Sequence, residues 1–529
     1  MKLHFWKCVL SLALLTFIPL LHGQELRYEQ LHTSNGVLEG VVSTDGKVRT
    51  FKGIPYAAPP VGPLRWKPPQ HAPVWSGVRK AVEYGPRCMQ GRIFDDMIFH
   101  DAGPSEDCLY LNIWTPANPL QGKLPVMVWI HGGGFRAGAS SEPRQDGGNL
   151  SKLGVIVVSF NYRLDIFGFF AHPELTKESP RNASGNYGLL DQVAALEWVK
   201  RNIGTFGGDP DNVTIFGESA GSMSVSALMA SPLAQGLFQR AIGESGACLG
   251  RKPIKSRQEV ENQGVKFAES EFGTSGIEVL RAKSAQDLMD AALKPKATHF
   301  SMDVDGYFLP QDCRSIYAAG QQSHVPLLAG WNRDEGEYEA FFDKDAPTLQ
   351  NYSARAKAKF GSKADAFLKA YSATTDAQAR RAAQDYAGDD FIAFSTWKWL
   401  DLHVKSGNSP VFRYEFDQTL PLSADAKPGQ EPTAPHASDI EYVFRVLSSR
   451  DLPWRPEHHE VSELMAAYWT NFAKTGDPNG PGLPRWPLYN AQTNYQVMHL
   501  KPNAAPAPDD HRARYEFLDQ LGPQLTPTP

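Results

Sequence analysis

The segment Gly217-Glu218-Ser219-Ala220-Gly221 constrains this chain most, because it stands between a predicted strand and a predicted helix. The strand is the apolar run from Val213 to Phe216, and the residues after Ser219 favour a helix. A serine hydroxyl is a poor nucleophile until a base removes its proton, and it must project from a sharp turn to meet a substrate. Bulky side chains at the two glycines would collide with neighbouring backbone in such a turn. The pattern therefore predicts that Ser219 is a nucleophile.

Apolar, β-branched runs alternate with helical stretches along the chain, which is typical of a mainly parallel sheet covered on both faces. The clearest strands cover residues 126–130, 155–160, 213–216, 327–329, 411–416 and 495–500. Residues 187–201 and 461–474 favour helices, and Gly476 is placed to cap the second one. Residues 255–294 and 343–386 are also rich in helical patterns. We expect them to be insertions over the active-site edge of one large domain.

A second glycine-rich segment stands upstream of the first. The predicted strand Val126 to Ile130 runs into His131-Gly132-Gly133-Gly134-Phe135, whose successive glycines leave backbone N–H groups unhindered. Such a loop can point donors at the negative oxygen that develops on an attacked ester carbonyl. The N–H of the residue after the nucleophile, here Ala220, is the other contributor. A lone run of glycines would be a flexible turn, but its combination with the Ser219 segment favours an oxyanion hole.

A serine nucleophile in this setting needs an acid and then a histidine later in the chain. After the predicted strand 325–329 comes an acidic loop, in which either Asp334 or Glu335 could orient an imidazole. His436 is the best candidate for the base, since it lies downstream in a loop ahead of an apolar run. Pattern alone leaves four other downstream histidines open, namely His403, His458, His459 and His499.

Charge and motif content exclude several kinds of partner. The net charge of -5 comes from 53 basic and 58 acidic residues, and no basic run suited to tracking phosphates is visible. We therefore expect no nucleic-acid partner. The string Glu457-His458-His459-Glu460 is interpreted as solvated polar residues at a helix start, so that no metal or cofactor is implied.

The first 23 residues are predicted to be a signal peptide. Lys2 and Lys7 supply a positive start, the apolar run from Val9 to Leu21 is too short to span a bilayer comfortably, and Gly23 is a small residue before a possible cleavage point. Residues 24–529 would then form a single catalytic domain, secreted or periplasmic, with no stable membrane span.

Export would leave four cysteines in an oxidising compartment. An even number of cysteines there allows two disulfides. These cysteines are Cys88, Cys108, Cys248 and Cys313. Four cysteines permit three connectivities, and spacing alone does not choose between them.

With these motifs, the chain resembles the type-B carboxylesterase family, which also includes cholinesterases and some lipases. The resemblance spans nearly all of residues 24–529. Besides the segments around Gly133 and Ser219, its markers are Phe51-Lys52-Gly53-Ile54-Pro55-Tyr56-Ala57, Ser105-Glu106-Asp107-Cys108-Leu109-Tyr110-Leu111-Asn112, Phe206-Gly207-Gly208-Asp209-Pro210 and Asp334-Glu335-Gly336. The resemblance implies an α/β-hydrolase fold, with helical insertions over the active site, and hydrolysis of carboxylic esters.

Applied residue by residue, the resemblance implies that Ser219 is the nucleophile and His436 is the base. It also implies that the acid is Glu335 rather than Asp334. Gly133, Gly134 and Ala220 match the family's oxyanion-hole positions. Glu218, beside the nucleophile, is expected to tune the electrostatics of the site. The reaction would proceed through an acyl-enzyme intermediate on a small-molecule ester.

The resemblance also implies a disulfide between Cys88 and Cys108, which leaves Cys248 with Cys313 as a second pair.

Cholinesterases carry a tryptophan shortly before the equivalent of Cys108, whereas residues 92–99 contain none. A cage for a choline ester is therefore not expected. Asp95 and Asp96 are interpreted as solvated loop residues, with a preference for cationic or polar substrates as the alternative.

Two other functions are kept as alternatives. One is a non-catalytic binding protein that resembles cholinesterases, and the other is a lipase or amidase on the same fold. Sequons for glycosylation, which matter if the host glycosylates secreted proteins, begin at Asn149, Asn182, Asn212 and Asn351.

Overall fold

The computed structural model describes residues 27–118, 123–295, 298–427 and 429–522. The predicted signal peptide, residues 1–23, lies outside these ranges. None of the helices within them combines the length and the apolar character that crossing a membrane requires.

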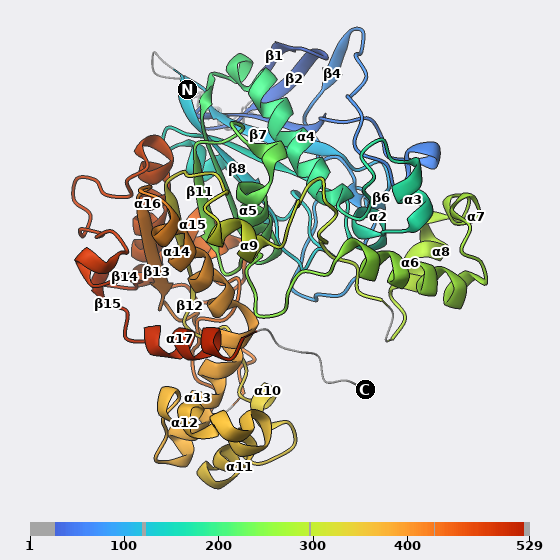
Figure 1. Cartoon of the computed structure of the whole chain (residues 1–529). Helices are drawn as coiled ribbons and strands as arrows, with labels where there is room; N and C mark the ends of the chain where they lie inside the picture. Colours follow the sequence, from blue (N-terminus) through green and yellow to red (C-terminus); the bar gives the residue numbers. More distant parts are fainter. Residues whose placement is uncertain (1–26, 119–122, 296–297, 428, 523–529) are drawn as a thin grey trace, which may run out of the picture.

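One large twisted sheet organises the described residues, and its middle is parallel (Figure 1). The strands are β1 (Arg27–Thr33), β2 (Gly36–Val42), β3 (Val48–Pro55), β4 (Val78–Lys80), β5 (Arg87–Cys88), β6 (Pro104–Ser105), β7 (Tyr110–Pro116), β8 (Leu124–Ile130), β9 (Ile156–Phe160), β10 (Gly208–Glu218), β11 (Arg240–Glu244), β12 (Leu327–Asn332), β13 (Val411–Phe416), β14 (Gln496–Leu500) and β15 (Ala505–Pro508). Their order is β1-β2-β3-β7-β9-β8-β10-β11-β12-β13-β14-β15, with β4 beside β2 and with β5 and β6 in a separate pair. The strands from β9 to β14 run parallel, and antiparallel pairs close both edges.

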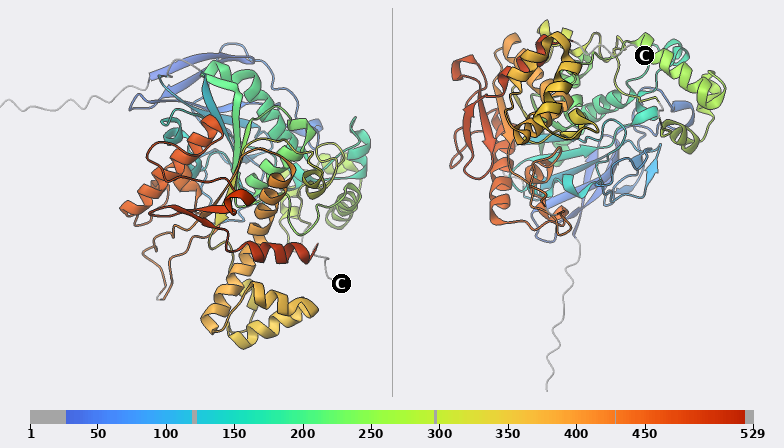
Figure 2. Two further views of the ribbon diagram at one scale, coloured as in Figure 1. Left: turned by 60° about the vertical axis from the view of Figure 1, so that its left-hand side comes forward. Right: turned by 90° about the horizontal axis from the view of Figure 1, so that it is seen from below.

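Helices cover both faces of the sheet (Figures 1 and 2). They are α1 (Gly148–Ser151), α2 (Asp165–Phe169), α3 (Pro173–Glu178), α4 (Tyr187–Asn202), α5 (Ala220–Ala230), α6 (Arg257–Phe272), α7 (Ile277–Arg281), α8 (Ala285–Ala292), α9 (Cys313–Ala318), α10 (Glu339–Phe342), α11 (Leu349–Phe360), α12 (Ala364–Ala370), α13 (Asp376–Gly388), α14 (Phe394–Ser406), α15 (Ile440–Phe444), α16 (Pro456–Thr475) and α17 (Arg512–Gln520). The structure thus confirms the predicted large, mostly parallel sheet flanked by helices.

Strand β8 shows why both faces need cover. Its side chains alternate between the two hydrophobic clusters of the protein: Val126, Val128 and Ile130 belong to one, and Met127 and Trp129 to the other. The first cluster includes residues of α4 and α5, and the second includes residues of α16. A strand that is apolar on both faces is stable only in the middle of such a sandwich, since each face buries apolar area against a helix.

The predicted elements are found with small changes at their ends. Strand β13 has the predicted bounds, whereas β10 and β12 are longer than expected. Helix α16 ends at Gly476, whose φ of 83° and N–H bond to the Phe472 carbonyl close the last turn. The two helix-rich stretches contain α6–α8 and α11–α13, and Figure 1 shows α10–α13 as a lobe that projects from the body.

Two disulfides join segments that the sheet leaves apart. Cys88 pairs with Cys108, and Cys248 pairs with Cys313. The first bridge connects β5 to the segment just before β7, and the second connects the segment after β11 to the first residue of α9. Cys88–Cys108 is the pair that the family resemblance implied, and Cys248–Cys313 is the pair that it left over.

Candidate active site

Ser219 lies in a tight turn between β10 and α5. Its φ of 55° and ψ of -119° are rare for a residue with a side chain, so the surrounding contacts must hold this conformation. The Ser219 N–H donates to the Glu244 carbonyl at 2.8 Å. A Cβ on Gly221 would lie only 1.9 Å from the Ile130 carbonyl oxygen. Glycine at this position therefore lets α5 start close against β8 and presents the serine at the end of its strand.

The glycine loop after β8 packs against this turn. A Cβ on Gly132 would lie 2.8 Å from the Glu218 carbonyl oxygen and 3.2 Å from the Ser219 Cβ. Gly133 has a φ of 99°, and a Cβ there would lie 2.1 Å from the Ala137 carbonyl oxygen. Residues with larger side chains would push the loop away from the serine, so its glycines set the distance between the two segments.

The glycine loop and the start of α5 also carry backbone donors without acceptors. The N–H groups of Gly133 and Gly134 have no protein acceptor among the described residues. The Ala220 N–H is at the first position of α5, where a helix supplies no acceptor of its own. Unpaired N–H groups beside a serine hydroxyl are suited to hold a negative oxygen.

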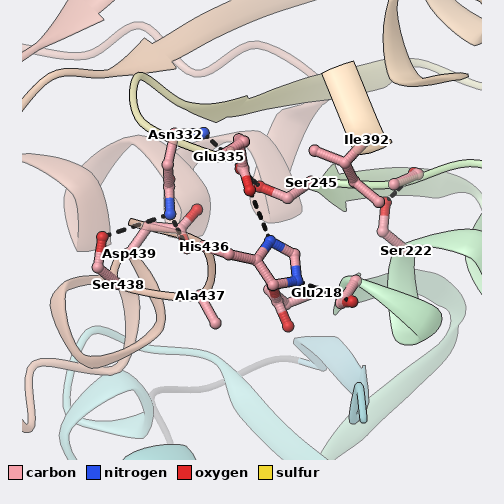
Figure 3. Close-up of polar contacts among 12 residues, drawn as sticks. Glu218, Ser222, Ser245, Asn332, Glu335, Ile392, His436, Ala437, Ser438 and Asp439 are labelled. Atoms are coloured by element: carbon pink, nitrogen blue, oxygen red, sulfur yellow. Dashed lines mark hydrogen bonds and ion pairs between the residues drawn. The ribbon is translucent and has the colours of Figure 1, made fainter. Parts of the chain in front are cut away.

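His436 contacts both the serine and an acid, and Figure 3 shows its ring between Glu335 and Glu218. Its Nε2 lies 2.9 Å from Ser219 Oγ, and its Nδ1 lies 2.6 Å from Glu335 Oε2. The three residues follow separate strands, β10, β12 and β13, and His436 is 217 positions from Ser219 in the chain. Such a chain of contacts orients the imidazole with one nitrogen toward the hydroxyl and the other toward a carboxylate.

The other oxygen of Glu335 is also held. Its Oε1 accepts the Asn332 backbone N–H at 2.8 Å and the Ser245 hydroxyl at 2.5 Å. Glu335 is buried, and with these donors its carboxylate has one orientation left, toward His436. Preorganisation of this kind is what a positioned acid requires.

Asp334, the neighbouring acid, has a different task. Its carboxylate forms ion pairs with Arg333 at 2.7 Å and Arg381 at 2.6 Å, and it accepts the Ala434 N–H at 2.9 Å. Burial alone would raise the pKa of Asp334, but the bonds from Arg333 and the Ala434 amide hold that pKa below its usual value. Asp334 thus fastens the loop that carries His436.

Glu218 lies on the opposite side of the imidazole from Glu335. Its Oε1 is 3.2 Å from His436 Nε2. Burial raises the pKa of Glu218 to about 8, against the lowering effect of the His436 charge. Burial also lowers the pKa of His436, but the negative charges of Glu218 and Glu335 outweigh it and raise that pKa above its ordinary value. The site therefore favours a positive charge on the imidazole.

The remaining candidate histidines form contacts elsewhere. His403 bonds the Val325 carbonyl and Gln322, His458 bonds Tyr442 and Gln418, and His499 bonds Asp417. His459 is exposed on α16. Among the histidines of the described residues, His436 is thus the one whose ring contacts Ser219.

Residues 92–99 lie near the glycine loop. The Met97 methyl group would be 3.1 Å from a Cβ on Gly133. Asp95 is almost fully exposed and faces Arg92 at 3.5 Å, and Asp96 lies 3.6 Å from Arg144. On the other side, the ring of Phe391, which is 56% exposed, stands edge to face with His436 at 5.2 Å. Apolar groups thus flank the reactive atoms, while both aspartates face arginines.

Two supporting residues carried no recognised sequence signal. Ser245 contacts Glu335, and the pairing of β10 with β11 places it next to Ser219, since Glu218 and Glu244 are in register. Arg144 donates to the Ala437 carbonyl at 2.5 Å and lies 3.4 Å from Glu441, which holds the chain just after His436. The repeated Gly-Glu-Ser triplet at residues 243–245 is the signal that could have identified Ser245.

This arrangement of sheet, turn and glycine loop defines an α/β hydrolase. The protein superposes on the solved structure of a PNB esterase with a TM-score of 0.78, at 34% sequence identity, over 93% of this chain and 99% of that one.

Comparison of sequences gives the family. A model of the carboxylesterase family matches residues 27–518, so the chain belongs to this family and is a carboxylic ester hydrolase. A fumonisin B1 esterase from Sphingopyxis macrogoltabida is 37% identical over 87% of this chain and 84% of its own length. A liver carboxylesterase from Sus scrofa is 36% identical, covering 94% of each chain. A medium-chain fatty acyl-CoA hydrolase precursor from Anas platyrhynchos is 36% identical, covering 95% of this chain and 94% of the relative.

Proposed function

We propose that the protein hydrolyses carboxylic esters through a Ser219–His436–Glu335 triad and an acyl-enzyme intermediate. The observation that carries this proposal is the continuous line of contacts from Ser219 Oγ through both nitrogens of His436 to Glu335. No metal or cofactor has a role in this mechanism.

In the first half of the reaction, Ser219 Oγ attacks the ester carbonyl carbon while His436 Nε2 takes the hydroxyl proton. The N–H groups of Gly133, Gly134 and Ala220 hold the oxyanion. The tetrahedral intermediate then collapses: the bond to the alcohol oxygen breaks, and His436 returns the proton to that oxygen. Alcohol leaves, and the acyl group stays on Ser219.

In the second half, a water molecule attacks the acyl carbonyl and gives its proton to His436. The bond to Ser219 Oγ breaks, the serine regains the proton, and the carboxylic acid leaves. Glu335 keeps the imidazole in the productive tautomer and stabilises its positive charge throughout. Glu218 adds a further negative or hydrogen-bonding group at 3.2 Å from His436.

The test is a panel of p-nitrophenyl esters of rising acyl chain length, combined with intact-mass measurement after rapid quenching. We expect turnover and a transient increase in the mass of the protein by one acyl group. Ser219→Ala should lose both, whereas Ser270→Ala, which changes an exposed serine on α6, should keep both.

Other outcomes favour the alternatives. A folded protein that hydrolyses none of these esters would contradict the mechanism and favour a binding protein. Activity that survives Ser219→Ala would assign the nucleophile to another residue. A preference for long acyl chains or for amides would assign the protein to lipases or amidases on the same mechanism.

We also propose that the protein is exported as one catalytic domain after loss of residues 1–23. This proposal rests on the composition of those residues and on the two disulfides, which form in oxidising compartments. N-terminal sequencing of the protein recovered from periplasm or medium should start at Gln24. Recovery of a chain that still begins at Met1 from the cytoplasm alone would contradict it.

A further inference from the structure

A second group of ionisable side chains lies away from Ser219, on strands β13 and β14. Glu415 on β13, Asp417 just after it and His499 on β14 each present a ligand atom, and these atoms lie within 4.8 Å of one another. Glu415 and His499 are directly paired in the parallel register. Glu415 and Asp417 are two residues apart, so they share one face of the sheet. Sheet geometry thus gathers the three groups.

The buried carboxylate of Glu415 has only distant partners. Glu415 is only 5% exposed, and its carboxylate accepts no hydrogen bond from the residues that the structure describes. The nearest nitrogens of basic side chains are His511 Nδ1 at 3.8 Å and the Arg413 guanidinium at 4.0 Å. Arg413 is already engaged, because it forms an ion pair with Asp509 and stacks over Trp331 at 4.1 Å. Burying a charge without a close partner is costly, so this carboxylate is poised for a cation.

We propose that Glu415, Asp417 and His499 bind one divalent transition-metal ion, and that His511, whose Nδ1 lies 3.8 Å from Glu415, moves toward the ion as the fourth ligand. Imidazole and carboxylate together suit zinc, whereas calcium and magnesium prefer oxygen ligands alone. Two carboxylates also neutralise the charge of a divalent ion. This proposal revises the sequence-based expectation of no metal, and it is independent of the proposed triad.

Binding also requires two rearrangements around Asp417. Asp417 Oδ2 now accepts a bond from His499 Nδ1 at 2.7 Å and lies 3.6 Å from Lys501 Nζ. The metal would replace the first contact, and the half-exposed Lys501 would turn to solvent. A histidine must be neutral to bind a metal, so acid should weaken binding.

The expected effect of the metal is on stability. His511 precedes α17, and His499 lies on β14, so one ion would tie the C-terminal helix to the sheet (Figure 1). A ligand that binds the folded state alone stabilises it by mass action. The metal should therefore raise the Tm.

The test uses the full chain, treated with chelator and dialysed. We expect calorimetric titration with zinc to show one site and to be accompanied by a higher Tm. Cobalt(II) should give visible absorption bands, which report nitrogen and oxygen ligands directly. His499→Ala and Glu415→Gln should each weaken zinc binding by at least about tenfold.

The matched control is His459→Ala, which removes an exposed histidine on α16 and should leave zinc binding unchanged. Circular dichroism and ester hydrolysis show whether each variant is folded, and His511→Ala, a half-exposed position before α17, provides a second test if His499→Ala does not fold. Absence of a zinc-dependent Tm shift in the wild type, or equal affinity in the folded His499, Glu415 and His459 variants, would overturn the proposal.

Discussion

Two Gly-Glu-Ser triplets lie side by side in this protein and have different roles. Gly217-Glu218-Ser219 ends β10, and Gly243-Glu244-Ser245 ends β11; the two strands are parallel and pair in register. Both serines have a positive φ, 55° for Ser219 and 52° for Ser245. Residue type, strand position and backbone conformation are therefore nearly the same.

The difference lies in what faces each side chain. Ser219 Oγ contacts His436 Nε2, whereas the buried Ser245 Oγ donates to Glu335. Glu218 lies beside His436, while Glu244 accepts the Trp469 indole N–H at 2.7 Å. Burial raises the pKa of both glutamates. The triplet therefore places a glutamate and a serine at the end of a strand, and the side chains that face them determine the role of each.

The largest expected contrast comes from removing each hydroxyl in turn, beginning with Ser219→Ala. We expect kcat for p-nitrophenyl acetate to fall on the order of 10⁶-fold, because no other group can form the acyl-enzyme. Steady-state kinetics on the folded variant measure this fall in kcat. A loss of this size in Ser245→Ala, together with a small loss in Ser219→Ala, would show that the roles of the two serines are assigned the wrong way round.

Glu335 connects the two triplets, since it contacts Ser245 directly and Ser219 through His436. Glu335→Gln keeps the shape but removes the charge that orients the imidazole, so kcat should fall about 10⁴-fold. Asp334→Asn is the matched control: it should keep most of the activity and lower the Tm, since its carboxylate binds arginines and the Ala434 amide. The reverse pattern would assign the acid to Asp334.

Ser245→Ala should have an intermediate effect. It removes one hydrogen bond to a charged carboxylate, worth about 1.5–3 kcal/mol, so we expect kcat/KM to fall about ten- to a hundredfold. Ser226→Ala, which changes another buried serine on α5, separates this effect from general loss of packing. A Ser245→Ala enzyme with wild-type kinetics would mean that Glu335 does not need this donor.

The smallest effect is a shift in pH dependence. His436 must be neutral to accept a proton, so activity should rise with pH through its pKa. The negative charge of Glu218 raises that pKa, and Glu218→Gln should therefore move the acid limb of kcat/KM to lower pH. Glu244→Gln should leave the limb in place, because Glu244 faces Trp469. Equal shifts in both variants would remove the distinction between the two glutamates.

Much of the architecture followed from local patterns. Runs such as residues 411–416 and 461–474 are apolar with the period of their element, and β13 and α16 form there. Gly221 and Gly133 were recognisable because close backbone approach excludes side chains at these positions. The resemblance to carboxylesterases added Glu335 and His436, which residue pattern alone left among two acids and five histidines.

By itself, then, the sequence determined the strands, the helices and the turn at Ser219, because these depend on residues that are close together in the chain. Tertiary structure decided which distant groups meet: His436 with Ser219, Asp334 with Arg381 and Ser245 with Glu335. It also decided that Glu415 is buried without a close partner. These contacts depend on strand order and loop paths, which the packing of the whole sheet sets and no short segment encodes.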